Sequence, residues 1–117
     1  MAKKFIVING PNLNMLGKRE TSIYGNLTLD QIQQHTQKSL QKLGHDVEVE
    51  WFQSNSESAL IEKIHTLVNS DIKGLVINPA AYSHTSIALL DALKILSVPI
   101  IEVHLSNTHL KIGRAHV

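Results

Sequence analysis

The sequence predicts an α/β fold in which a doubly wound parallel sheet carries helices on both faces. Two observations lead to this prediction: short apolar runs recur along the 117 residues, and segments with helical periodicity separate them. Strands that alternate with helices through short turns are typical of parallel sheets with right-handed crossover connections. The length suits one domain with its own core, and we find no repeat, linker or low-complexity segment.

The first elements are a strand, a long loop and a helix. Phe5–Ile8 is a compact apolar run typical of a strand that is buried on both faces. A polar loop then extends over residues 9–27. Thr28 fits a helix N-cap, Gln31 completes a capping box, and apolar residues at helical spacing lead to Gly44 as the stop signal.

The rest of the chain repeats this alternation. Acidic and apolar residues alternate in the second predicted strand, which indicates one face exposed to water. The remaining predicted elements are, in order, a strand over 46–52, a helix from a capping box at 54–57 to Val68, a strand over 74–77, a helix from Ser83 to about Leu96, and a strand over 100–103 after Pro99.

The C-terminal end is short for this architecture. A flavodoxin-like sheet with strand order 2-1-3-4-5, in three α/β/α layers, needs a fifth strand and a covering helix, and without them the fourth strand is an open apolar edge. Residues 112–117 also match the translation of a common sequencing-adapter oligonucleotide. We therefore expect a domain over residues 1–110 that lacks the usual fifth strand and last helix, and a non-native tail over 111–117.

Composition narrows the class of function. Eleven basic residues against ten acidic ones give a formal charge of +1, and aromatic residues make up only 4%, so nucleic-acid binding is not expected. The chain has no cysteine, which excludes disulfides, thiolate catalysis and thiolate metal sites. The apolar run at 5–8 is too short for a signal peptide, and no segment has the length of a membrane span. We expect a cytoplasmic protein that does not bind membranes.

Three polar segments follow predicted strands, at residues 10–14, 78–84 and 102–107. Because the carboxyl ends of parallel strands meet at one edge, where open α/β sheets bind ligands, we expect these segments to form one site. Arg19 and Tyr24 lie in the long loop before the first helix, and a guanidinium held beside the phenol would lower its pKa from about 10. A surface arginine and a tyrosine that only packs are the alternative.

Glu102 and His104 are the most specific pair. Residues two apart on a strand share a face, so the carboxylate can orient the imidazole as a general acid or base, although a purely structural pair is also open. Asn78 before a proline and His84 near a helix start could bind a ligand, or could serve as turn and capping residues. A metal site at the histidines is disfavoured, because neither cysteine nor HExxH-type spacing is present, and we expect none.

Together these segments resemble the type II 3-dehydroquinate dehydratases, or type II dehydroquinases. The resemblance runs in order, at family spacing, from the first residues to about His109. The matching segments are Ile8–Asn14, Leu16-Gly17 with Arg19, Tyr24-Gly25, Asn78–Ser86 and Glu102–Asn107. It implies a flavodoxin-like fold and a lyase that dehydrates 3-dehydroquinate to 3-dehydroshikimate through an enolate, without metal or cofactor. That step belongs to the shikimate pathway, which leads to chorismate and the aromatic amino acids.

The resemblance also implies residue roles. Tyr24 would remove the C2 proton, with Arg19 keeping it ionised and stabilising the transition state. His104, oriented by Glu102, would protonate the departing hydroxyl, and Asn12 would hold the water that stabilises the enolate. The substrate-binding residues would be Asn78, His84, Asp91, Leu105 and Ser106. Self-association is implied too, because this family assembles trimers into dodecamers.

The resemblance also concerns assembly, and near the C-terminal end the sequence departs from the family pattern. Asp91 would reach the site of a neighbouring subunit. Lys111 stands where the family has arginine, and Ala115 stands where a substrate-binding arginine is expected, with Arg114 out of register by one. The resemblance therefore predicts impaired substrate binding. Two alternatives stay open: a non-catalytic flavodoxin-like module that carries a flavin or nucleotide, and an inactive fragment that acts only as a partner in oligomers.

Overall fold

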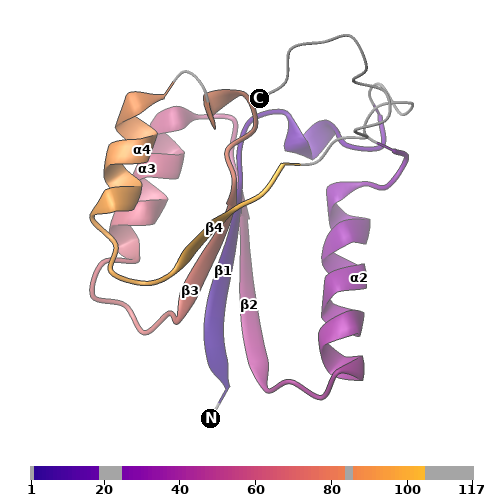
Figure 1. Cartoon of the computed structure of the whole chain (residues 1–117). Helices are drawn as coiled ribbons and strands as arrows, with labels where there is room; N and C mark the ends of the chain where they lie inside the picture. Colours follow the sequence, from indigo (N-terminus) through magenta and orange to yellow (C-terminus); the bar gives the residue numbers. More distant parts are fainter. Residues whose placement is uncertain (1, 19–24, 84–85, 105–117) are drawn as a thin grey trace, which may run out of the picture.

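The computed structural model describes residues 2–18, 25–83 and 86–104. Its centre is a parallel sheet in the order β2-β1-β3-β4, in which the strands are β1 (Lys3–Asn9), β2 (Val47–Gln53), β3 (Gly74–Asn78) and β4 (Ile100–Glu102). The helices are α2 (Leu29–Lys42), α3 (Glu57–Thr66) and α4 (Ile87–Lys94), with 3-10 turns η1 (Leu13–Met15) and η2 (Ala80–Ser83). In Figure 1, α3 and α4 lie on one side of the sheet and α2 on the other. The predicted α/β layers and strand order are confirmed.

The core lies between the sheet and the pair α3 and α4. Alternate residues of β1 and β3 point to this side, where aliphatic side chains from both helices meet them. The most deeply buried members of the cluster are Ile6, Ile8, Leu60, Ile64, Leu75, Ile77, Leu89 and Ala92. This layer therefore supplies most of the apolar burial that stabilises the fold.

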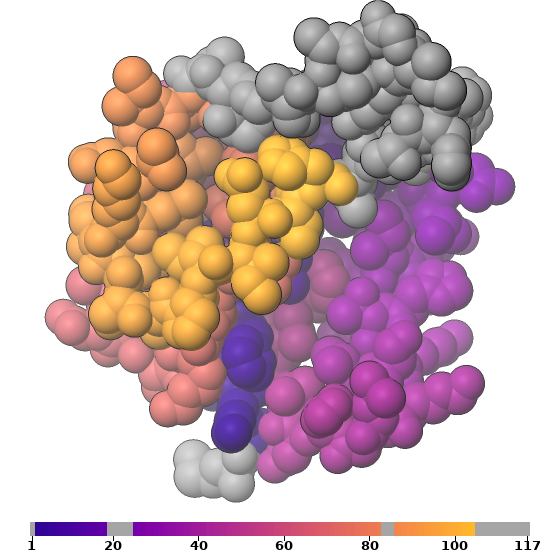
Figure 2. Space-filling model, viewed as in Figure 1, coloured from indigo at the N-terminus to yellow at the C-terminus, as the bar shows by residue number. Residues whose placement is uncertain are grey.

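The opposite face of the sheet is less well covered. Phe5, Val7 and Val76 on this face are only half-buried, and Ile101 at the edge strand is 60% exposed. Helix α2 covers this side but contributes no buried residue. In the space-filling view, β4 lies at the surface of the molecule (Figure 2). The helical periodicity of α2 is therefore real, but its apolar side is only partly removed from water.

Capping explains where two helices begin. At α2 the Thr28 hydroxyl accepts from the Gln31 N–H at 3.1 Å, and the Gln31 side chain accepts from the Thr28 N–H at 2.9 Å, as predicted. The capping box predicted at residues 54–57 is wrong. Helix α3 is capped by Ser56, whose hydroxyl accepts from the Ala59 N–H at 3.2 Å. The Ser54 hydroxyl accepts instead from the Ser56 N–H at 3.0 Å, which shapes the turn before the helix.

The helix predicted to begin at Ser83 begins later. Ala80 after the proline adopts a left-handed φ of 53°, and the chain forms η2 before α4 starts at Ile87. The N-cap is Ser86, whose hydroxyl accepts from the Leu89 N–H at 2.9 Å. The sequence offers two serines at which this helix could begin, and the later one supplies the cap.

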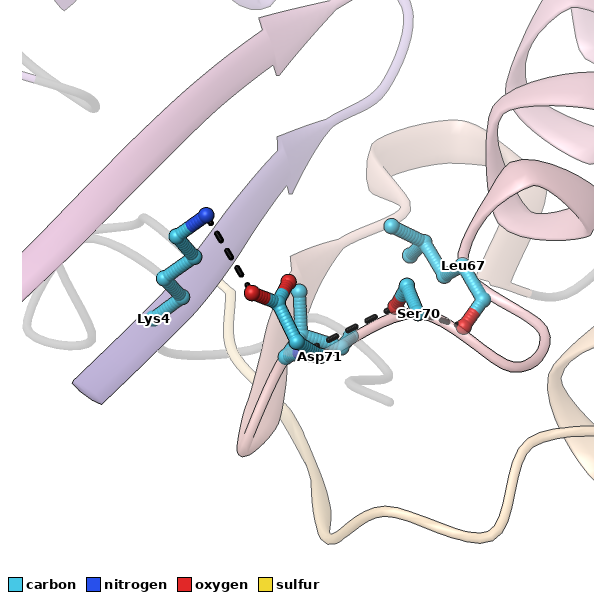
Figure 3. A network of polar contacts seen from close by, with 5 residues as sticks. Lys4, Leu67, Ser70 and Asp71 are labelled. Atoms are coloured by element: carbon cyan, nitrogen blue, oxygen red, sulfur yellow. Dashed lines mark hydrogen bonds and ion pairs between the residues drawn. The ribbon is translucent and has the colours of Figure 1, made fainter.

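A polar network lies at the end of the sheet remote from the carboxyl ends of the strands (Figure 3). Lys4 near the start of β1 contacts the Asp71 carboxylate at 3.2 Å, and this hydrogen bond raises the pKa of Lys4. Nearby, the Ser70 hydroxyl donates to the Leu67 carbonyl at 2.7 Å. These contacts join the end of α3 and the turn before β3 to the sheet, so we assign them a structural role.

Candidate active site

The carboxyl ends of β1 and β3 are held close together by their backbones. The Gly10 N–H donates to the Asn78 carbonyl oxygen at 2.8 Å, and beside them the Val103 N–H donates to the Ile77 carbonyl oxygen at 2.8 Å. A Cβ atom on Gly10 would lie 2.6 Å from the carbonyl oxygen of Pro79. Glycine is therefore required here for the ends of β1 and β3 to converge as the sequence predicts.

Asn12 lies in the loop directly after β1, with its side chain exposed and its backbone in the left-handed region at φ 68°. Its N–H donates to the Asn55 side-chain oxygen at 2.8 Å. The Gln53 amide group donates to the same oxygen and to the Gly10 carbonyl, both at 3.1 Å. The loop after β2 thus holds the loop after β1, a contact that the sequence reasoning missed.

Asn78 at the end of β3 is 2% exposed. Its side-chain oxygen accepts from the Ala80 N–H at 3.1 Å, which fixes the orientation of the carboxamide. The Nδ2 group has no hydrogen-bond partner within the described ranges, and the same is true of Asn9, its register partner on β1. A buried donor without a partner is costly, so Asn78 has the environment of a group that donates to a bound ligand.

The structure brings Glu102 and His104 together as predicted. The imidazole Nε2 lies 3.2 Å from the Glu102 carboxylate oxygen, and both side chains are accessible to solvent. Glu102 also borders a cleft of about 170 Å³ that extends toward α4 and is lined mainly by apolar side chains. A carboxylate that accepts from one ring nitrogen fixes the imidazole and leaves the other nitrogen for proton transfer.

The sequence has a clear family assignment. The family model described as Dehydroquinase class II matches residues 3–115. The chain belongs to the class II dehydroquinase family. Two curated relatives are 3-dehydroquinate dehydratases: that of Actinobacillus pleuropneumoniae serotype 5b (strain L20) is 54% identical over 108 residues, covering 92% of this chain and 68% of the relative. That of Histophilus somni (strain 2336) is 55% identical over 106 residues, covering 91% and 69%.

A solved dehydroquinase has the same fold. The crystal structure of type II dehydroquinase from Butyrivibrio crossotus DSM 2876 superimposes with a TM-score of 0.80 at 43% identity, covering 88% of this chain and 70% of that one. The strand order and layers described above are therefore those of a class II dehydroquinase. The chain spans a little over two thirds of the length of these relatives.

The predicted site residues divide into two groups in this dehydroquinase. The structure describes Asn12, Asn78, Asp91, Glu102 and His104; all except Asp91 follow or end strands at one sheet edge, whereas Asp91 lies exposed on α4. Several other predicted groups lie outside the described residues: Arg19, Tyr24, His84, Leu105, Ser106, His109 and the tail 111–117. Asn55 could have been found from sequence only as part of a fourth polar segment, the one that follows the second strand at the same edge.

Proposed function

We propose that this chain is a hydro-lyase that converts 3-dehydroquinate to 3-dehydroshikimate in the shikimate pathway. Family membership and the names of the curated relatives support this reaction. The structural observation that carries it is the contact between Glu102 and His104 at the carboxyl edge of the sheet. Loss of a hydroxyl group needs a proton donor at the departing oxygen, and an oriented imidazolium supplies one.

The dehydration then proceeds in two proton transfers. The Tyr24 phenolate removes the C2 proton of the substrate, and the electrons move onto the ketone oxygen to form an enolate. Arg19 stabilises both the phenolate and the charge that develops in the transition state. The enolate collapses as His104 protonates the hydroxyl, which leaves as water, while Glu102 stabilises the imidazole orientation.

The asparagines bind oxygen atoms in this scheme. The unpartnered Nδ2 of Asn78 donates to a substrate oxygen, which satisfies a buried donor. Asn12 holds a water that donates to the enolate oxygen, so its contribution is largest in the transition state. We assign the remaining contacts with substrate hydroxyl and carboxylate groups to His84, the Leu105 amide and Ser106.

Turnover tests this proposal directly. We expect the purified chain to convert 3-dehydroquinate to a conjugated enone, followed by its ultraviolet absorbance, with the Tyr24→Phe variant as the inactive control. Because Lys111 and Ala115 replace arginines of the family pattern, the assay should extend to high substrate concentration. A folded chain that forms no enone would contradict the proposal, and visible flavin absorbance after purification would favour a binding module. A cytoplasmic location stays a prediction that cell fractionation can check.

We also propose that copies of the chain associate through α4. Ile87 and Leu90 on this helix are 84% and 55% exposed and lie beside Asp91, which is exposed as well. A second copy that covers these apolar side chains would bring the Asp91 carboxylate to the site of its neighbour, as the family resemblance implies. Exposed aliphatic side chains grouped on one helix are typical of interfaces.

Sedimentation checks this association. The parent chain is expected to sediment as an oligomer, and Ile87→Asp is expected to shift it toward the monomer, because burying an unpaired carboxylate in the contact is costly. Leu43→Asp is the matched control, since Leu43 is 69% exposed at the far end of α2. A parent that sediments as a monomer at every concentration, or equal effects of both changes, would contradict the assignment.

A further inference from the structure

We propose that Asn55 is a positioning residue for the dehydration reaction, acting through the loop that carries Asn12. The inference rests on the proposed function, because it concerns the same site. Asn55 lies in the connection between β2 and α3, and β2 itself contributes none of the residues assigned to the chemistry. Its contacts nevertheless reach two of the site segments.

The first contact fixes the backbone of Asn12. The Asn55 side-chain oxygen accepts from the Asn12 N–H at 2.8 Å, and the Gln53 amide group donates to the same oxygen at 3.1 Å. Gln53 also donates to the Gly10 carbonyl, so the two side chains hold successive parts of the loop after β1. On the other side, the Asn12 carbonyl accepts from the Met15 N–H at 2.9 Å.

Within the described ranges, this arrangement uses the backbone of Asn12 and not its side chain. Asn12 stands at the N-cap of η1, yet its side chain makes no capping hydrogen bond there. The position of its carboxamide is therefore set by a backbone held at φ 68°, an unfavourable conformation for any residue except glycine and, to a lesser degree, asparagine. An external acceptor on the N–H is what keeps this conformation in place.

The second contact reaches the segment after β3. The Tyr82 hydroxyl donates to the Asn55 backbone carbonyl at 3.1 Å. Tyr82 belongs to η2, which immediately precedes His84 in the sequence. Asn55 therefore joins the loops after β1 and β3. It lies 43 residues after Asn12 and 27 residues before Tyr82.

Asn55 should contribute little to the free energy of unfolding. Its side chain is exposed, and the cap of α3 is supplied by Ser56 instead. The variant loses the two exposed hydrogen bonds that the Asn55 side-chain oxygen accepts, and the loss of exposed hydrogen bonds has a small effect on unfolding. A small displacement of a transition-state group, by contrast, has a large effect on rate. The Asn55→Ala variant should therefore fold and lose activity.

Steady-state kinetics supply the first test. Asn55→Ala is expected to lower kcat about 10- to 100-fold with little change in KM, because Asn12 acts mainly on the enolate. Asn55→Asp retains an oxygen acceptor at the same place and should recover most of the rate. Asn69→Ala is the matched control, since Asn69 is exposed with a left-handed φ of 62° and lies after α3, so alanine there strains the backbone only. Equal kinetics for Asn55→Ala and the parent, or equal losses for both alanine variants, would overturn the inference.

A second test does not need turnover. The amide proton of Asn12 should exchange with solvent faster in Asn55→Ala than in the parent or Asn69→Ala, as followed by nuclear magnetic resonance. A third test returns to kinetics: Asn55→Ala should add little to Asn12→Gly, a change that removes the Asn12 side chain and suits the backbone conformation. An unchanged Asn12 exchange rate, or fully additive effects, would refute the positioning role. An inactive parent with this exchange pattern would refute the proposed function alone.

Discussion

Replacing His104 with alanine is expected to lower kcat about 10²- to 10⁴-fold, the range that a positioned general acid contributes. The departing hydroxyl would then leave without a proton, and water is a poor substitute in a site organised for one donor. KM should change much less, because the proton is needed in the transition state and not in the ground state. Initial rates followed by enone absorbance measure both constants.

Glu102→Gln separates orientation from chemistry. Glutamine still offers an oxygen to the imidazole 3.2 Å away but removes the charge that stabilises an imidazolium. We expect a loss in kcat that is smaller than that of His104→Ala. If the histidine variant retained a rate close to that of the parent, the pair would be structural and another group would supply the proton.

Substituting Gly10 by alanine is expected to lower the free energy of unfolding by about 1–3 kcal/mol, as overpacking of a filled site does. The added Cβ would lie 2.6 Å from the Pro79 carbonyl oxygen and 3.2 Å from that of Asn78, both of which are backbone atoms. The ends of β1 and β3 must move apart, which displaces Asn12 and Asn78 together. Urea unfolding measures the stability, and kcat should fall in the protein that remains folded.

Gly44→Ala is the control for this change. Gly44 ends α2 with a left-handed φ of 72°, and a Cβ there meets no atom within 4 Å. Alanine should lower stability through backbone strain but leave kcat at the parent value. If Gly10→Ala behaved in the same way, the convergence of strand ends would have no part in activity.

Much of the fold could be predicted because its signals are local. The apolar runs of β1 and β3 and the capping box at Thr28 lie within a few residues, and each was confirmed. The capping box at 54–57 failed because two serines compete for the cap: the Ser56 hydroxyl caps α3, while the Ser54 hydroxyl accepts in the turn before it. The start of α4 was misplaced because both Ser83 and Ser86 are suitable N-cap residues, and the hydrogen bond that makes Ser86 the cap is seen only in the structure.

The geometry of the site could be predicted only for residues that lie close together on one strand. Glu102 and His104 lie two residues apart, so their contact follows from the alternation of a strand. The contact of Asn55 with Asn12 joins residues 43 apart, and it depends on how far two loops extend beyond the sheet. The unpartnered amide of Asn78 likewise depends on burial in three dimensions, which composition and spacing do not encode.

The helices bury very different amounts of apolar surface on the two faces of the sheet. The two helix layers should therefore differ in their free energy of local unfolding. We expect helix α2, which has no buried residue, to detach at a lower free energy than the layer of α3 and α4, which holds the core. A molecule in that partly open state would present Phe5, Val7 and Val76 as an apolar surface of the sheet formed by the described residues. Exposed apolar surface of this kind favours association with other chains, so we expect aggregation to begin on the side of α2.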